Sequence, residues 1–284
     1  MAQYSAHRNE HFNTSNSDVH EVVMLADKDG NILNTSGSAS NIPIANGDVD
    51  GYAAIHKFGR NPNVGNAPET VWMHGGKYQY LAVDSPSTLY AYSANAQDSA
   101  SGTGARTITI QGLDNNFNEI EETVTVGGAA TTLEFLRVYR AFVATAGSLN
   151  TNIGDVLIST ASGGTGTVLA DIGTIGTGTT FGLGQTQLAL YTIPAGKTGY
   201  LTTWNVGCAP MNNKATVLLK SRELDGDAPF RTKDIVDLVG GYHTQHYSIP
   251  LRFPEKTDIE VVAAGDTGTI ISSSFDVILV DNPT

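Results

Sequence analysis

The stretch that decides the fold is 105-ARTITIQGLDNNFNEIEETVTV-126. In its first half Ile108 and Ile110 alternate with threonine and glutamine, and in its second half isoleucine and valine alternate with glutamate and threonine. Successive side chains of a strand point to opposite faces of a sheet, so this period of two predicts two half-buried strands. The Asp-Asn-Asn between them supplies turn residues, which makes a β-hairpin the natural interpretation. Glu122 is the one polar residue on the apolar side.

The same kind of sequence continues through most of the chain. The segment 19–33 predicts two short strands around the turn Asp27-Lys28-Asp29-Gly30-Asn31. Trp72 and 78–83 are expected to open the first β-region. Further strands are expected near 89–93, 106–113, 119–126, 136–144, 155–159, 187–193, 199–206, 215–221, 242–249, 258–263 and 272–280. Helix-compatible windows are scarce, and 233–238 would form one or two turns at most.

Composition shifts divide the chain. Residues 1–18 predict an N-terminal arm, and 34–68, rich in Ser, Asn, Gly and Pro, predicts extended, loop-like chain. The Gly- and Thr-dense segment 162–184 predicts a loop-rich passage with short strands, and a domain boundary lies at its start. Closely spaced strands with turns between them are typical of sandwiches and jelly rolls. The predicted fold class is therefore all-β, with two β-sandwich or jelly-roll-like domains behind an extended N-terminal arm. The expected divisions are 1–68, an arm and docking segment, 69–163, the first β-domain, and 164–284, the second β-domain.

Charge and composition exclude several classes of function. The 284 residues carry a formal net charge of −12, and only 15% of them are charged. That balance opposes binding to nucleic acid or to an anionic membrane, because neutralising phosphate needs clustered Lys and Arg. Cys208 is the one cysteine, so no intramolecular disulfide is expected. The N-terminal residues lack the apolar core of a secretory signal, and no apolar run approaches the roughly 18 residues of a membrane span, so synthesis in a cytoplasm is expected.

The segment 194-PAGKT-198 contains the GKT of a phosphate-binding loop. That motif needs a glycine five residues before Gly196, where Tyr191 stands, and a helix after it. Strand-like sequence follows instead, so a tight turn between two strands is expected.

Two oxygen-rich segments, 27–31 and 114–118, resemble fragments of calcium loops. Counted from Asp27 or from Asp114, neither has the glycine at position six or the glutamate at position twelve that an EF-hand requires. Both are expected to be β-turns, in which Asp and Asn bond their own backbone. The Asp225-Gly226-Asp227 segment is likewise expected to be a turn.

The histidines do not form a recognisable metal site. His243 and His246 are three residues apart on an expected strand, so they would point to opposite faces. The remaining histidines are scattered along the chain, at His7, His11, His20, His56 and His74.

No catalytic arrangement of acids or nucleophiles is recognised. Glu119 and Glu121 would point one way along their strand and Glu122 the other, so no pair converges as a glycosidase requires. Cys208 has no nucleophile signature around it. Trp72, Trp204 and the tyrosines could stack on sugar rings, but packing in a core or interface is the favoured interpretation. We therefore expect no catalytic, cofactor-binding or metal site.

Several blocks of sequence carry a resemblance to a known group. They are GYAAIHKFGRNPNVG at 51–65 with Val71-Trp72 after it, SANAQDSASGTGARTITIQGLDNNFNEIEETVTV at 93–126, VYRAFVATAG at 138–147, LALYTIPAGKTGYLTTWNV at 188–206, PEKTDIEVVAAG at 254–265 and SSSFDVILVDN at 272–282. Together they resemble virion structural proteins of marine tailed bacteriophages, cyanophages in particular. The resemblance covers about residues 19–284, fits least well over 207–240, and transfers no site residue.

This resemblance implies a non-enzymatic virion protein, assembled in the host cytoplasm. The expected role is decoration of the capsid surface, as a cement or fibre-like protein docked through 1–68 with the C-terminal β-domain outward. The expected partners are other virion proteins, major capsid or tail proteins, and further copies of this chain, with a trimer as one symmetry. Two alternatives stay open: a tail, baseplate or fibre component in host recognition, and a carbohydrate-binding adhesin that contacts a host surface glycan.

Overall fold

The computed structural model describes residues 25–26, 32–33, 41–176, 181–224 and 228–283. The chain divides into two compact units, Met1–Ala54 and Ile55–Thr284. In the first unit β1 (Leu25–Ala26) and β2 (Ile32–Leu33) pair antiparallel, which confirms two short strands within 19–33, and a short helix follows as α1 (Asn41–Asn46). The predicted arm at 1–18 and the turn at 27–31 lie outside the described residues.

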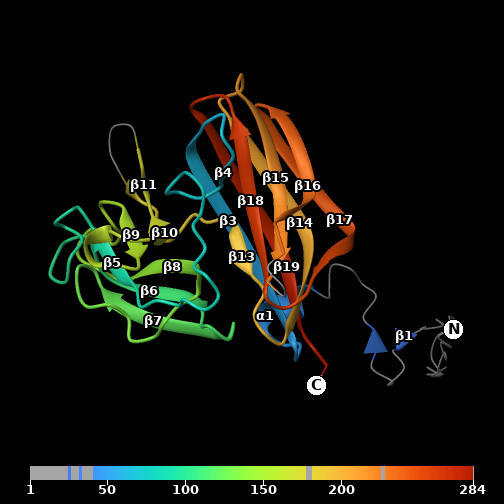
Figure 1. The fold of residues 1–284 in the computed structure, drawn as a ribbon, viewed down its shortest axis with the longest axis horizontal. Coiled ribbons are helices and arrows are strands. Elements are labelled where there is room, and N and C mark those ends of the chain that lie inside the picture. Colours follow the sequence, from blue (N-terminus) through green and yellow to red (C-terminus); the bar gives the residue numbers. More distant parts are fainter. Residues whose placement is uncertain (1–24, 27–31, 34–40, 177–180, 225–227, 284) are drawn as a thin grey trace, which may run out of the picture. The chain divides into compact units, whose positions relative to one another are not determined.

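The second unit confirms the all-β fold class, and its sheets are built mainly from antiparallel strand pairs (Figure 1). Its strands are β3 (Tyr52–Val64, which begins in the first unit), β4 (Glu69–Thr70), β5 (Tyr90–Ser93), β6 (Ala105–Leu113), β7 (Glu119–Thr125), β8 (Arg137–Ala146), β9 (Val156–Ser159), β10 (Val168–Ile172), β11 (Thr174–Ile175), β12 (Phe181–Gly182), β13 (Leu190–Thr192), β14 (Lys197–Ala209), β15 (Lys214–Glu223), β16 (Arg231–Val239), β17 (Gly241–Phe253), β18 (Thr257–Gly265) and β19 (Thr269–Asp281). One 3-10 turn, η1, spans Ser162–Gly164.

The strands from β5 to β10, green and yellow-green in Figure 1, form two three-stranded sheets that we call the β5–β10 region. The sheets are ordered β10-β9-β5 and β7-β6-β8. The predicted hairpin is β6–β7, with Ile108 opposite Val124 and Leu113 opposite Glu119. Glu122, the polar exception in its pattern, accepts hydrogen bonds from the backbone N–H groups of Thr132 and Leu133 at 2.8–2.9 Å. Glu122 therefore interrupts the apolar alternation because its carboxylate holds the backbone of the loop at Thr132 and Leu133.

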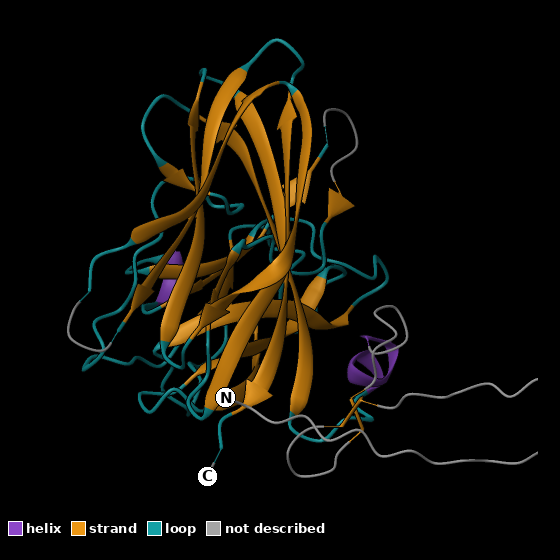
Figure 2. Cartoon of the chain, turned by 90° about the vertical axis from the view of Figure 1, so that its right-hand side faces the viewer, coloured by secondary structure: helices purple, strands orange, loops and turns teal. Residues whose placement is uncertain are grey.

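The remaining long strands form two further sheets, the β13–β19 region (Figure 2). One has the order β13-β18-β15-β16 with β4 added on β18, and the other has the order β17-β14-β19-β3. On β14, β15 and β19 buried residues alternate with more exposed ones, as a strand with one face in a core requires. Trp204 on β14 and its neighbour Phe275 on β19 are fully buried in that core.

Three predictions about single segments were wrong. The segment 34–68 was expected to be loop-like, yet it contains the 13-residue strand β3. Its buried positions are Lys57, Gly59, Asn61 and Val64, so three of four carry no apolar side chain and the period of two is invisible. Gly59 is required there, because a Cβ would lie 2.2 Å from the backbone nitrogen of Ala189.

The second error is the short helix at 233–238, which is part of β16. Lys-Asp-Ile-Val-Asp-Leu has apolar residues on both faces. In this edge strand burial alternates, but the half-buried positions hold Asp234, Val236 and Leu238 while the exposed ones include Ile235, so the apolar residues do not follow the period of two. The predicted opening of the first β-region at 78–83 also contains no strand in the described residues, and that segment is irregular backbone. The predicted domain divisions stay a prediction.

Candidate functional site

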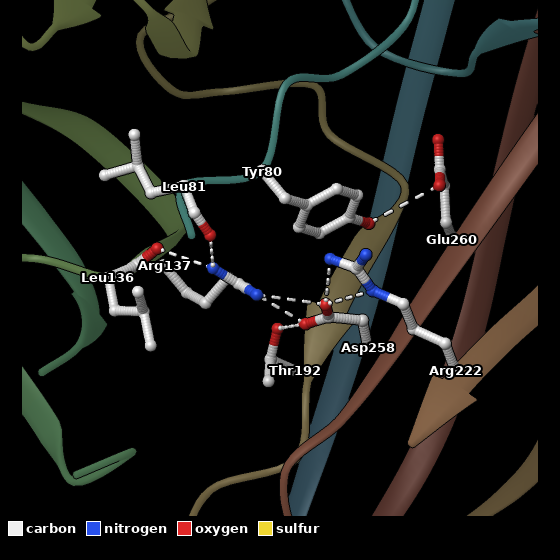
Figure 3. Close-up of polar contacts among 8 residues, drawn as sticks. All are labelled: Tyr80, Leu81, Leu136, Arg137, Thr192, Arg222, Asp258 and Glu260. Carbon is white, nitrogen blue, oxygen red and sulfur yellow. Dashed lines mark hydrogen bonds and ion pairs between the residues drawn. The ribbon is translucent and has the colours of Figure 1, made fainter. Parts of the chain in front are cut away.

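The most developed polar cluster is centred on the fully buried Asp258 of β18 (Figure 3). Arg137 of β8 donates from Nε to Oδ1 at 3.0 Å and from Nη2 to Oδ2 at 3.2 Å. Arg222 of β15 donates from Nε to Oδ2 at 3.0 Å, and its Nη2 forms an ion pair with the same oxygen at 2.9 Å. The hydroxyl of Thr192 on β13 donates to Oδ1 at 2.5 Å. One carboxylate is therefore shared by two arginines and a threonine from three strands.

The ring of Tyr80 completes this cluster. The guanidinium carbons of Arg137 and Arg222 lie 5.0 and 4.5 Å from its centroid, within the range of cation–π attraction. The Tyr80 hydroxyl donates to Glu260 at 3.5 Å, and Thr70 donates to the same carboxyl at 2.5 Å. Burial raises the pKa of Glu260 and of Tyr80, because the charged form of each is poorly solvated there.

This cluster is a joint between the two sheet regions. Arg137 comes from the β5–β10 region, whereas Asp258 and Arg222 come from the β13–β19 region. Arg137 is 1% exposed and its Nη1 donates to the carbonyls of Leu81 and Leu136. Arg137 and Asp258 make their hydrogen bonds within the protein, so these bonds orient the two regions.

A second buried charge, Lys57 of β3, lies close to β8. Its Nζ donates to the carbonyl oxygen of Tyr139. Burial, reinforced by the positive charge of Arg140, lowers the pKa of Lys57 to about 7. The side chain is therefore only partly protonated at neutral pH.

The segments singled out in the sequence have structural roles. Gly196 lies in the tight turn before β14 with φ +72°, and Lys197 pairs with Asp281 at 2.7 Å, which confirms a turn in place of a phosphate loop. Asp114 Oδ1 accepts the backbone N–H groups of Asn116 and Asn118 at 2.8 Å, which confirms the second oxygen-rich segment as a turn. The Asp225–Asp227 segment lies outside the described residues.

His243 and His246 on β17 point to opposite faces of their sheet, as predicted, and Glu121 of the hairpin bonds across to the neighbouring strand. His243 packs its ring on Trp204, with 6.4 Å between centroids, while His246 contacts Thr203 on the other face of the sheet. Glu121 accepts from Gln111 at 2.6 Å. Three histidines, His7, His11 and His20, lie outside the described residues.

The two tryptophans are buried, which confirms the packing interpretation for both. Trp72 packs on Tyr78 with 5.1 Å between ring centroids, and Trp204 donates from Nε1 to Ser273 at 3.1 Å. Cys208 is also buried, and burial raises the pKa of its thiol.

The structure brings together two His–Asp pairs that the sequence did not reveal. His56 lies 2.6 Å from Asp276, 220 residues away, and His74 lies 3.3 Å from Asp171, 97 residues away. Residues so far apart in the chain form no local sequence motif, so the sequence could not indicate these pairs. Within the described residues, no three His, Cys, Asp or Glu side chains could hold a metal ion together. No helix in the same part of the chain is long and apolar enough to cross a membrane.

Comparison with known proteins adds little. No protein-family model matches the chain, and no curated protein matches it. Among solved structures, one of the infectious bursal disease virus Gx strain is 9% identical with a TM-score of 0.24, covering 81% of this chain and 72% of that chain. One of the Gt strain of the same virus is 9% identical with a TM-score of 0.16, covering 82% and 80%. Scores this low carry no argument about fold or function.

Proposed function

We propose that this chain is a non-enzymatic structural protein of a bacteriophage virion, assembled in the host cytoplasm and displayed on the head surface as a symmetric oligomer. The observation that carries the proposal is the Arg137–Asp258–Arg222 joint, in which the fully buried Arg137–Asp258 pair and the partly exposed Arg222 hold two sheet regions in a fixed orientation. Such a use of charge suits a rigid particle component. The sequence blocks at 51–65, 93–126 and 188–206 resemble phage virion proteins, and this resemblance supports a location in the phage particle.

The pattern of polar contacts supports a structural role over catalysis. The acids that could have served a reaction are used in architecture: Glu122 caps a loop, Asp114 forms a turn, and Asp258 joins two regions. The partners in this proposal are capsid or tail proteins and further copies of the chain, which would dock through residues 1–68.

Immunogold labelling of intact particles tests the location. We expect label over the heads, with antibodies raised against the purified chain and particles of an unrelated phage as control. Label confined to tails would replace the head assignment with a tail, baseplate or fibre role. Absence of the chain from purified particles, measured by mass spectrometry, would refute the virion proposal. Deleting residues 1–18 should lower occupancy on the particle, and unchanged occupancy would refute docking by the arm.

A further inference from the structure

One face of the β10-β9-β5 sheet carries a row of three dissimilar side chains. Tyr92 of β5 is opposite Leu157 of β9, and Leu157 is opposite Asp171 of β10. Their chain neighbours Ala91, Ile158 and Ala170 point into the core cluster. Because side chains alternate across a strand, the Tyr92–Leu157–Asp171 row lies on the face away from that core.

An open pocket of about 620 Å³ lies over this row. Met73 and His74 contribute one part of its lining, and Asn95 and Asp155 contribute another. A volume of this size is in the range that holds small organic ligands.

The backbone around the pocket is fixed before any ligand arrives. The buried carboxylate of Asp98 accepts the N–H groups of Ile153 and Gly154 at 2.7–3.1 Å and the hydroxyl of Ser93 at 3.0 Å. Asn152, also buried, donates to the carbonyls of Gly154 and Ile172. A preorganised site loses less conformational entropy on binding.

His74 and Asp171 form a directional pair at the pocket. His74 Nδ1 lies 3.3 Å from Asp171 Oδ2, and the Asp171 side chain is only 6% exposed, whereas the His74 side chain is 37% exposed. When Nδ1–H donates to the carboxylate, Nε2 remains a hydrogen-bond acceptor for a ligand. The other carboxylate oxygen of Asp171 has no hydrogen-bond partner among the described residues.

A glycine keeps the aromatic side of the pocket clear. Gly164 has φ +70°, and a Cβ there would lie 2.7 Å from Cδ1 of Tyr92 and 3.2 Å from Cδ1 of Leu157. Any other residue at this position would be strained and would press on the Tyr92 ring.

We propose that this pocket binds a carbohydrate, with one neutral pyranose ring stacked on Tyr92 and its hydroxyl groups bonded to His74 and Asp155. A pyranose has an apolar face of C–H groups and a rim of hydroxyl donors, which matches Tyr92, Leu157 and Met73 beside nitrogen and carboxylate acceptors. Two carboxyl groups in the lining disfavour an anionic ligand. Burial raises the pKa of Asp171, which weakens its attraction for a cation. The binding proposal does not depend on the virion role.

Saturation-transfer NMR on the purified full chain tests it, with the methyl α-glycosides of glucose, galactose and mannose and the methyl β-glycoside of N-acetylglucosamine. We expect at least one to bind with a Kd of about 1 mM, and Tyr92→Ala and His74→Ala each to weaken binding about tenfold. Tyr92→Phe keeps the ring and should retain binding. Tyr242→Ala, which removes an exposed tyrosine on another sheet, is the matched control and should bind as the wild type does.

Three outcomes would overturn the proposal: no binding by any of the four glycosides, equal binding by Tyr92→Ala, or loss of binding in the Tyr242→Ala control. Circular dichroism checks the fold of each variant. If Tyr92→Ala is misfolded, Asp155→Ala is measured in its place, because the Asp155 side chain is exposed and, among the described residues, accepts one hydrogen bond, from Thr174. Unchanged binding by a folded Asp155→Ala would then refute the site. A glycan array of bacterial surface polysaccharides distinguishes a polymeric source from free sugar.

Discussion

Replacing Asp258 with alanine removes the one carboxylate that Arg137, Arg222 and Thr192 share. Four hydrogen bonds and one further ion-pair contact, all of 2.5–3.2 Å, are lost at once. Arg222 is 24% exposed and can turn toward water, but Arg137 is 1% exposed and cannot. Its guanidinium would keep two neutral carbonyl partners and the ring of Tyr80, and its positive charge would be buried without a counter-charge.

Breaking a buried ion pair by removing one partner costs about 3–5 kcal/mol, because the remaining charge stays desolvated. Domains are stable by roughly 5–15 kcal/mol, so Asp258→Ala should remove about a fifth of the total or more. With a urea dependence of about 3 kcal/mol per molar, the unfolding midpoint should fall by roughly 1–2 M.

The two tryptophans report on different cores. Trp72 lies in the core cluster of the β5–β10 region, which also includes Leu188 and Leu190, and Trp204 is buried in the core of the β13–β19 region. Urea unfolding is therefore measured by fluorescence in Trp72→Phe and Trp204→Phe backgrounds. Asp258→Ala should shift both transitions downward and separate them, since the joint that couples the regions is gone.

The matched control is Asp281→Ala, which breaks the exposed pair with Lys197 and should cost less than about 1 kcal/mol. A loss for Asp258→Ala no larger than for this control, or transitions that fall together without separating, would refute the assignment of Asp258 as the joint.

Three further predictions concern other buried polar groups. Lys57 has a folded pKa of about 7 and an unfolded value of 10.5, so the unfolded chain binds a proton that the folded chain lacks between these values. The free energy of unfolding should therefore rise by about 1 kcal/mol per pH unit from pH 7 to 10, a slope that Lys57→Met should remove in urea titrations. Burial raises the pKa of Glu260 above 4.5, so wild-type stability should fall as pH rises from that value through the folded pKa. Glu260→Gln should lose less stability than the wild type between pH 4 and pH 7 in thermal scans, and an equal loss would contradict this. Asp98→Ala leaves the buried N–H groups of Ala105, Ile153 and Gly154 without their acceptor and should cost about 3 kcal/mol, with faster hydrogen exchange at those three amides.

The sequence predicted those strands whose burial comes from apolar side chains. The hairpin at 105–126 is an example, because Ile108 and Ile110 belong to the hydrophobic core cluster and the polar residues that alternate with them do not. Strand β3 could not be predicted in this way. Its inward positions hold Lys57, Gly59 and Asn61, whose burial depends on β8 and on residues 69–71 and 189, which no local pattern contains.

The candidate sites were beyond sequence reasoning for a similar reason. Arg137 and Asp258 are 121 residues apart, and His74 and Asp171 are 97 apart. In the sequence each of these four residues is an isolated polar residue among predicted strands. Only the pairing of the strands in the structure shows which side chains contact one another. The turn at Asp114, by contrast, depends on hydrogen bonds from backbone N–H groups within four residues of its carboxylate. Its sequence was therefore enough to predict it.

The joint and the pocket are linked through one strand. Asp258 and Glu260 lie on β18, and the same strand pairs with β4, whose Thr70 bonds Glu260. Four residues after Thr70 the chain reaches His74, which lies against Asp171 on a sheet of the other region. The pocket is thus lined by the β10-β9-β5 sheet and by the segment that follows β4. An apolar interface of equal area could stabilise the contact between the two regions as well, but directional Arg–Asp bonds also fix the orientation of one region on the other.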